Sequence, residues 1–209
     1  MPSLGNMPST PSTPKTRALA LVRKRGIARA REFNAVGVPR VYLKRMQEEG
    51  LLVQRGRGLY QLADAKLSPA HSLAEAARIV PHGVICLLSA LQFHELTTQT
   101  PHEVWMLIGW KKWAPTRPPV LLRIIRATGE SLTAGIELHR IERVLVPITV
   151  PAKTVADCFK YRSKVGLDVA IEALRNCLRN RRATADELWK YATINRVQNV
   201  MRPYLEALL

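Results

Sequence analysis

Basic side chains between Pro39 and Gly58 are the residues of this sequence best suited to chemistry with a polyanion. A helix that begins at Pro39 and ends at Gly50 would direct a largely basic set of side chains away from its apolar face or to the margin of that face: Arg40, Val41, Lys44, Arg45 and Gln47. Arginine and lysine donate hydrogen bonds to guanine edges and phosphates, and recognition helices hold such residues in their N-terminal half. The pattern therefore predicts a helix that reads duplex DNA.

A second basic group follows at Arg55-Gly56-Arg57-Gly58. The apolar runs 51–54 and 59–62 flank it, and its glycines permit the positive φ of a tight turn, so we predict a β-hairpin. Arg55 and Arg57 at the tip of this hairpin would straddle the DNA backbone or enter a minor groove.

Three short helices are expected ahead of the hairpin. Thr16 can cap the first, which runs to about Arg25, and the second spans residues 28–35. Proline suits the first position of the third helix because it has no amide hydrogen to lose there. One shared apolar face should pack the third helix on the other two: Tyr42, Leu43 and Met46. Three helices followed by a hairpin is the order of a winged helix-turn-helix.

The charge of the chain is uneven along its length. Its 209 residues hold 32 Lys and Arg against 16 Asp and Glu, a formal net charge of +16, which indicates a polyanionic partner. Residues 1–66 hold 13 basic and 4 acidic residues, a denser excess than in the rest. A new helix should begin after Lys66, where Ser72 and Glu75 have the spacing of a capping box. We therefore divide the chain into a disordered tail (1–15), a winged helix (16–66) and a second domain (67–209).

Composition also bounds the location of the protein. Hydrophobic residues make up 47% of the chain, enough for a sizeable core, but the longest apolar run, residues 84–93, is half of the roughly 20 residues that a membrane span needs. The first fourteen residues lack the basic and apolar regions of a secretory signal. Three widely spaced cysteines in apolar segments suit a reducing compartment: Cys86, Cys158 and Cys177. We expect a cytoplasmic protein with no membrane partner.

The second domain has strand patterns between groups of helical patterns. Four segments are rich in Val, Ile and Leu: 104–108, 120–127, 136–141 and 145–150. Helical patterns lie before and after them: 72–77, 84–94, 153–162, 167–179, 184–194 and 199–208. The expected fold class is α+β, an N-terminal winged helix-turn-helix followed by a larger mixed domain of about four strands with flanking helices.

Four segments of the second domain carry a family resemblance. They are Leu91-Gln92-Phe93-His94-Glu95-Leu96-Thr97-Thr98-Gln99, Val104-Trp105, Pro151-Ala152-Lys153-Thr154-Val155-Ala156-Asp157-Cys158-Phe159-Lys160, and Asp168-Val169-Ala170 with Glu172-Ala173-Leu174. Together with the predicted winged helix they resemble the AbiEi-type antitoxins of type IV toxin-antitoxin systems, from about Thr16 to the C-terminus. The resemblance implies a bacterial regulator that binds double-stranded DNA at its own operator. It also implies a C-terminal domain that counters a nucleotidyltransferase-like toxin without a stable complex.

An enzyme that processes nucleic acid is the main alternative, and a winged helix used only for protein docking is another. No phosphate-binding glycine loop, helical histidine pair or close cysteine pair is present. Glu137, Lys153 and Asp157 could serve a metal-dependent nuclease, but Lys153 and Asp157 also have the spacing of a surface ion pair on a helix. We expect no catalytic residue, no metal site and no cofactor.

Two further basic groups are secondary candidates for nucleic-acid contact. Lys111 and Lys112 lie between Trp110 and Trp113, an arrangement that can stack bases and hold phosphates or simply anchor a loop. Arg181 and Arg182 near a helix end could extend a basic track or complement the helix dipole.

Overall fold

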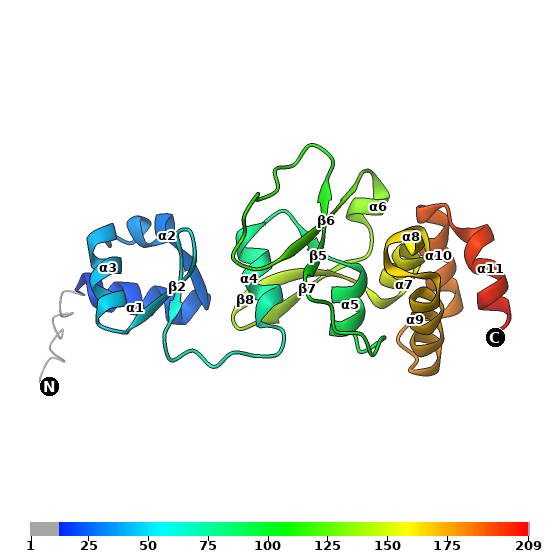
Figure 1. Ribbon diagram of the computed structural model, residues 1–209, viewed down its shortest axis with the longest axis horizontal. Coiled ribbons are helices and arrows are strands. Elements are labelled where there is room, and N and C mark those ends of the chain that lie inside the picture. The colour runs from blue at the N-terminus through cyan, green and yellow to red at the C-terminus, as the bar shows by residue number, and fades with distance from the viewer. Residues whose placement is uncertain (1–12, 209) are drawn as a thin grey trace, which may run out of the picture. The chain divides into compact units, whose positions relative to one another are not determined.

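The computed structural model describes residues 13–208, in which the chain divides into two compact units, one ending at Lys66 and the other beginning at Leu67 (Figure 1). Within these residues no helix combines the length and apolar character that crossing a membrane requires.

The first unit packs three helices on a small antiparallel sheet. Its elements are α1 (Pro14–Arg25), β1 (Ile27–Arg29), α2 (Ala30–Ala35), α3 (Arg40–Glu48), β2 (Leu52–Gly56) and β3 (Leu59–Leu62). The strand order is β1-β3-β2, so the hairpin strand β3 lies in the middle. The predicted winged helix-turn-helix is confirmed, with β1 as an added strand. Three residues are too few to show the alternation by which a strand is recognised in a sequence.

Helix α1 begins earlier than predicted. The Thr13 hydroxyl accepts a hydrogen bond from the Thr16 amide at 3.2 Å, so Thr13 is the cap and Thr16 is not. Pro14 occupies the first helical position, which suits its missing amide hydrogen. Pro14 and Lys15, assigned above to the tail, are therefore helical. The rest of the predicted tail, residues 1–12, lies outside the described residues.

Helix α3 packs through the predicted apolar face. Leu43 and Met46 are buried and Tyr42 is half-buried. Pro39 is the residue before the helix rather than its first residue. Gly50 adopts a φ of 67°, and the Leu51 amide donates to the Met46 carbonyl at 2.9 Å, which ends the helix as predicted.

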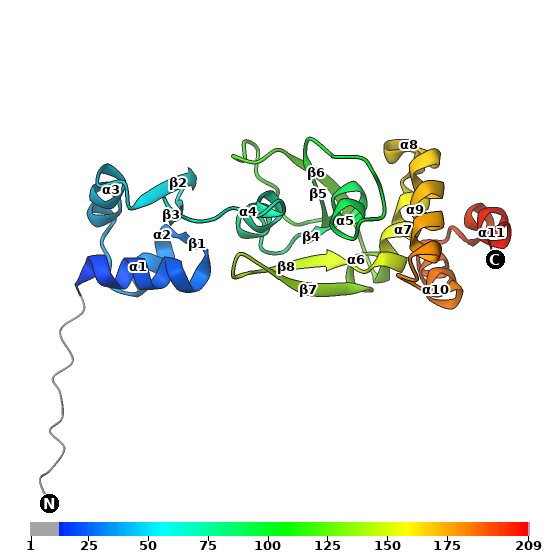
Figure 2. The same ribbon diagram turned by 90° about the horizontal axis from the view of Figure 1, so that it is seen from below.

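The second unit contains a mixed five-stranded sheet with helices on it and beside it. Its elements are α4 (His71–Ile79), β4 (Val84–Ile85), α5 (Leu87–Phe93), β5 (Val104–Gly109), β6 (Leu122–Ala127), α6 (Glu130–Thr133), β7 (Ile136–Ile141), β8 (Val144–Thr149), α7 (Pro151–Lys160), α8 (Arg162–Val165), α9 (Leu167–Arg179), α10 (Ala185–Asn195) and α11 (Gln198–Glu206). The strand order is β6-β5-β4-β8-β7. Figures 1 and 2 show helices α7–α11 gathered at one end of this sheet. The α+β class is confirmed.

The centre of the sheet corrects one helix prediction. The pattern over residues 84–94 predicted a single helix, but Val84 and Ile85 form the short strand β4 and the helix begins only at Leu87. Ile85 pairs with Met106 on one side and with Ile148 on the other. Two distant segments therefore determine its conformation, and this raises the strand count from the predicted four to five.

The start of α4 also differs from the sequence prediction. The helix begins at His71 after Ala70, so the expected capping box of Ser72 and Glu75 is wrong. The Glu142 carboxylate instead accepts hydrogen bonds from the Ser68 amide at 2.5 Å and from the His71 ring at 2.7 Å. A distant turn between β7 and β8 thus holds the segment that leads into α4, and no side chain caps the helix.

Helix α7 contains a buried polar pair in a predominantly apolar core. Residues 152–159 are all buried, and α7 contacts α5, α9, α10 and α11. The Lys153 ammonium donates to both Asp157 oxygens at 2.6 and 2.7 Å, and Asn195 of α10 donates to Asp157 at 2.7 Å. The Lys153 side chain is 0% exposed and that of Asp157 is 3% exposed. The expected surface ion pair is therefore a buried one, because both residues lie on the face of α7 that the other helices cover.

This burial predicts the effect of removing one charge. Lys153→Met leaves the Asp157 carboxylate without its counter-ion, and we expect a loss of about 3 to 5 kcal/mol in the free energy of unfolding. Lys153→Met combined with Asp157→Asn should recover most of that loss, because no charge is then buried and Asn195 keeps an acceptor. Urea unfolding of the three proteins measures this. A double variant no more stable than Lys153→Met would contradict the explanation.

A buried histidine joins α5 to the end of β8. The His94 ring hydrogen-bonds through Nε2 to the Thr149 carbonyl at 2.8 Å and lies beside the Phe93 and His139 rings. Burial lowers the pKa of His94, the bond to Thr149 opposes that shift, and the His139 ring lowers the pKa further. The neutral ring therefore donates to the carbonyl in the folded protein.

The lowered pKa of His94 gives stability a pH dependence. Below the ordinary pKa of about 6.5 the unfolded chain takes up a proton that the folded chain resists, so stability falls as the pH falls. The contribution of one such group is at most about 1.4 kcal/mol per pH unit. We expect His94→Gln, which keeps a donor for Thr149, to show a shallower loss of unfolding free energy between pH 7 and pH 5. Equal slopes in urea unfolding would exclude this role for His94.

Candidate nucleic-acid interface

Helix α3 presents an exposed face of mixed chemistry. Arg40, Val41, Lys44 and Arg45 are exposed and Gln47 is half-buried. Val41 is 68% exposed, and an apolar group among donors is what contact with a thymine methyl requires. The Lys44 ammonium lies 3.9 Å from Glu48, and both side chains are so exposed that this contact holds the lysine weakly. The Arg45 guanidinium lies 6.0 Å from the centre of the Tyr42 ring.

Two long-range contacts from α1 hold α3 at its ends. The Arg17 guanidinium donates to the Gly37 carbonyl at 2.9 Å, in the turn before α3. The Lys15 ammonium lies 2.6 Å from Glu49, just after α3. Sequence reasoning missed both residues, because partners 20 and 34 positions away leave no local signal. They orient the exposed face of α3 without belonging to it.

The wing separates the two arginines that the sequence placed together at its tip. Gly56 pairs with Leu59, so the turn consists of Arg57 and Gly58, and Gly58 has the positive φ that this turn requires. Arg57 is exposed. Arg55 lies at a bulge in β2, is half-buried, and donates from Nε to the buried Gln61 side chain at 2.9 Å. The prediction that Arg55 lies at the tip is therefore wrong, since the strand extends two residues further than its apolar run.

The wing is also tied to the helices. The Ala30 amide at the start of α2 donates to the Gly58 carbonyl at 2.8 Å. Within residues 13–66, neither Arg40 nor Arg57 has a hydrogen-bond or ion-pair partner for its side chain. The first unit therefore presents uncompensated guanidinium groups on both α3 and the wing.

Trp110 and Trp113 do not anchor the loop in which they lie. Trp110 is 65% exposed and Trp113 is 62% exposed, and Lys111 and Lys112 between them are exposed as well. The Arg126 guanidinium holds the loop instead, donating from Nη1 to three backbone carbonyls at 2.5 to 3.3 Å: those of Gly109, Trp110 and Lys112. The indole rings that could stack on bases and the lysine side chains that could contact phosphates are thus both accessible to solvent.

The other secondary group is partly neutralised. Arg182 lies 3.4 Å from the Glu95 carboxylate, whereas Arg181 is exposed in a left-handed conformation with φ 52°. These arginines follow the end of α9, where positive charge complements the helix dipole.

The residues considered for a nuclease are not combined into a metal site. Asp157 is buried and its oxygens are occupied by Lys153 and Asn195, while the Glu137 side chain is 60% exposed on β7. Among the residues that the structure describes, no group of three or more His, Cys, Asp or Glu side chains is arranged to hold a metal ion.

Comparison with known proteins assigns the first unit to a class. Residues 17–63 match the model of a family described as "Transcriptional regulator, AbiEi antitoxin", and this range contains α2, α3 and all three strands. The resemblance to AbiEi antitoxins is confirmed over these residues, and the class of protein that the winged helix indicates is a transcriptional regulator.

A solved structure has a similar fold. The crystal structure of the RV2827C protein from Mycobacterium tuberculosis matches with a TM-score of 0.60 and 12% sequence identity, over 86% of this chain and 71% of that one. At this identity the likeness establishes the fold alone. No curated protein matches the sequence.

The geometry of the first unit separates base reading from phosphate contact. Arg40→Ala or Lys44→Ala should relax sequence preference and cost about 1 to 3 kcal/mol of binding free energy wherever the side chain contacts a base in bidentate fashion. Arg57→Ala should instead weaken binding to all duplexes and reduce the salt slope by about one. Fluorescence anisotropy at several salt concentrations distinguishes these effects.

Lys164→Ala is the matched control for those variants, since Lys164 is an exposed cation of the second unit. The midpoint temperature of thermal unfolding should be unchanged in Arg57→Ala and lowered in Arg55→Ala, because of these two arginines only Arg55 has a partner in the sheet. If Arg57→Ala altered preference among sequences rather than overall affinity, the assignment of the wing to phosphate contact would be wrong.

Proposed function

We propose that the protein is a sequence-specific DNA-binding repressor of its own operon, and an antitoxin that counters a nucleotidyltransferase-like toxin. The observation that carries the DNA-binding half is the uncompensated basic surface of the first unit. Arg40 and Arg57 have no partners within residues 13–66, and two contacts from α1 orient the helix that holds Arg40. An uncompensated arginine on an ordered element is poised to bind phosphate or guanine.

In this proposal α3 enters the major groove of double-stranded DNA. Arg40, Val41 and Lys44 lie in its N-terminal half, which approaches base edges most closely in helix-turn-helix proteins. Arg45 and Gln47 lie further along and contact the backbone or the margin of the site. Arg57 at the wing tip reaches the flanking phosphates, and Arg55 supports the wing from within it.

The antitoxin half of the proposal is assigned to the second unit. It rests on the family description, which joins the regulator and antitoxin roles, and on the family resemblance of the segments that surround Asp157 and Glu172. The Glu172 carboxylate accepts hydrogen bonds from Thr97 and Thr98, so the segment around Glu172 contacts another segment of the resemblance, residues 91–99. We propose that this unit acts in the cytoplasm without turnover and without a stable complex with the toxin.

The proposal predicts that the two activities can be separated. Reversing the exposed charges of α3 and the wing should abolish operator binding and leave the fold intact, because exposed side chains of this face support no core: Arg40→Glu, Lys44→Glu and Arg57→Glu. In cells that express the toxin from an independent promoter, this variant should still protect. Gel shift with the upstream region and growth after toxin induction are the two measurements.

A chain that ends at Lys66, where the first unit ends, provides the converse test. It should bind the operator and fail to protect. If the charge-reversed variant lost protection at normal protein levels, antitoxicity would have to act through DNA and the two-function proposal would be wrong. If the wild-type protein bound its upstream region equally at low and high salt, or not at all, the repressor half would fail.

A further inference from the structure

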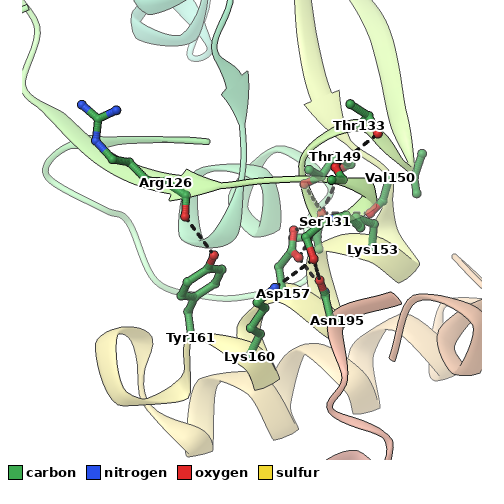
Figure 3. Close-up of polar contacts among 12 residues, drawn as sticks. Arg126, Ser131, Thr133, Thr149, Val150, Lys153, Asp157, Lys160, Tyr161 and Asn195 are labelled. Atoms are coloured by element: carbon green, nitrogen blue, oxygen red, sulfur yellow. Dashed lines mark hydrogen bonds and ion pairs between the residues drawn. The ribbon is translucent and has the colours of Figure 1, made fainter. Parts of the chain in front are cut away.

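The second unit contains a pocket of about 630 Å³ that the proposed function does not use. It lies where the ends of β6, α7 and α10 meet the short helix α6. Figure 3 shows Tyr161, Lys160, Ser131 and Asn195 of this region, which come from three different segments. Pockets for small ligands measure about 300 to 1,000 Å³, so its size suits a ligand much larger than an inorganic ion.

The charge of the pocket favours an anion. Three of its lining residues are basic and one is acidic: Arg126, Lys160 and Arg196 against Glu130. The Lys160 ammonium donates to a neutral partner, the Ser131 hydroxyl, at 2.8 Å. Burial lowers the pKa of Lys160; Asp157 opposes this, whereas the positive charges of Lys153 and Arg196 add to it. Lys160 and Arg196 therefore repel one another at the edge of the pocket, and an anion between them would relieve that repulsion.

The Asp157 carboxylate in the hydrogen-bond chain acts on Lys160 through space and does not bond to it directly. Asp157 is buried and already binds Lys153 and Asn195. Asn195 in turn accepts from the Ser131 hydroxyl at 3.0 Å, so Ser131 links Lys160 to this buried network. The dashed bonds in Figure 3 follow this chain. Lys160 at the floor of the pocket is thus held by a hydrogen-bonded chain that reaches the buried Asp157.

An aromatic side chain borders the same pocket. Trp110 lines it and is 65% exposed, and Arg126 fixes the turn that holds Trp110 through bonds to backbone carbonyls. Tyr161 also lines the pocket; burial raises the pKa of its hydroxyl to about 12, and the neutral hydroxyl donates to the Arg126 carbonyl at 3.5 Å. An exposed indole beside fixed positive charge is suited to stack a nucleobase whose phosphates lie on the cations.

We propose that this pocket binds a nucleoside phosphate, with the base stacked on Trp110 and the phosphates held by Lys160 and Arg196. A free phosphate would occupy a small part of the pocket and leave Trp110 unused. The site lies wholly within the second unit and is independent of the DNA-binding surface of α3 and the wing.

Isothermal titration calorimetry of the full chain with ATP, GTP, CTP and UTP tests the proposal, with inorganic tripolyphosphate as the probe that lacks a base. We expect at least one nucleotide to bind, and Lys160→Gln with Arg196→Asn to weaken it at least about tenfold, since two charge-assisted contacts are removed. Asparagine is chosen at position 196 because Arg196 is left-handed, with φ 58°, and asparagine tolerates that conformation. Trp110→Leu should weaken nucleotide binding and leave tripolyphosphate binding unchanged.

Matched controls separate local from general effects. Lys164→Gln with Arg175→Gln removes two exposed cations that do not line the pocket, and Trp113→Leu removes the neighbouring exposed indole. Both should bind nucleotide as the wild type does. Arg40→Ala should do so as well, which tests whether the surface of α3 contributes to nucleotide binding. Thermal unfolding verifies that each variant is folded.

Three results would overturn the proposal. The first is no binding of any nucleotide at concentrations up to about 1 mM, the weak end of specific affinities. The second is equal binding by the Lys160 and Arg196 double variant, and the third is tripolyphosphate binding as tightly as every nucleotide, with no effect of Trp110→Leu. The last result would indicate a polyanion site without base recognition. None of the three affects the repressor proposal, whose test uses operator DNA.

Discussion

The second unit depends on the buried ion pair between the Asp157 carboxylate and the Lys153 ammonium. The carboxylate is buried within the helices beside the sheet, where an uncompensated charge would be very costly. Lys153, one turn earlier on α7, supplies the opposite charge, and Asn195 at the end of α10 supplies a further donor. Because these partners come from two helices, the carboxylate fixes the position of α10 against α7. The same requirement continues outward through Ser131 to Lys160, so the floor of the pocket is a consequence of satisfying one buried charge.

The first unit is organised by a different constraint, which is the orientation of a short helix. Helix α3 has nine residues, too few for stability on its own, and only one of its faces is apolar. Leu43 and Met46 hold that face in the core, while contacts from Arg17 and Lys15 hold the two ends. The opposite face is then presented to solvent as a rigid surface. Binding of DNA by such a surface requires little further ordering of the backbone, which favours affinity and register.

The two units therefore present positive charge in different ways. On the first unit the cations of α3 and of the wing tip are exposed on separate elements, an arrangement suited to the proposed contact with the phosphates of an extended polymer. In the pocket of the second unit Lys160 is half-buried and bonded to Ser131, while Arg126 and Arg196 line the same pocket and are exposed, an arrangement suited to the small anionic ligand proposed above. Net charge alone does not distinguish these uses, since both contribute to the formal value of +16.

Local patterns in the sequence were sufficient for much of the fold. The i, i+3 spacing of Leu43 and Met46, the glycine that ends α3 and the glycine of the wing turn act within a few positions, so the winged helix and the α+β class followed from such local patterns. The same helical periodicity also predicted which face of α3 is exposed. Tertiary structure alone decided the rest: Ile85 became a strand because two distant strands flank it, and Glu142 holds the start of α4 through Ser68 and His71, where a local capping box was expected. It also made Lys153 and Asp157 a buried pair, because spacing along a helix identifies neighbours but not which face the remainder of the chain will cover.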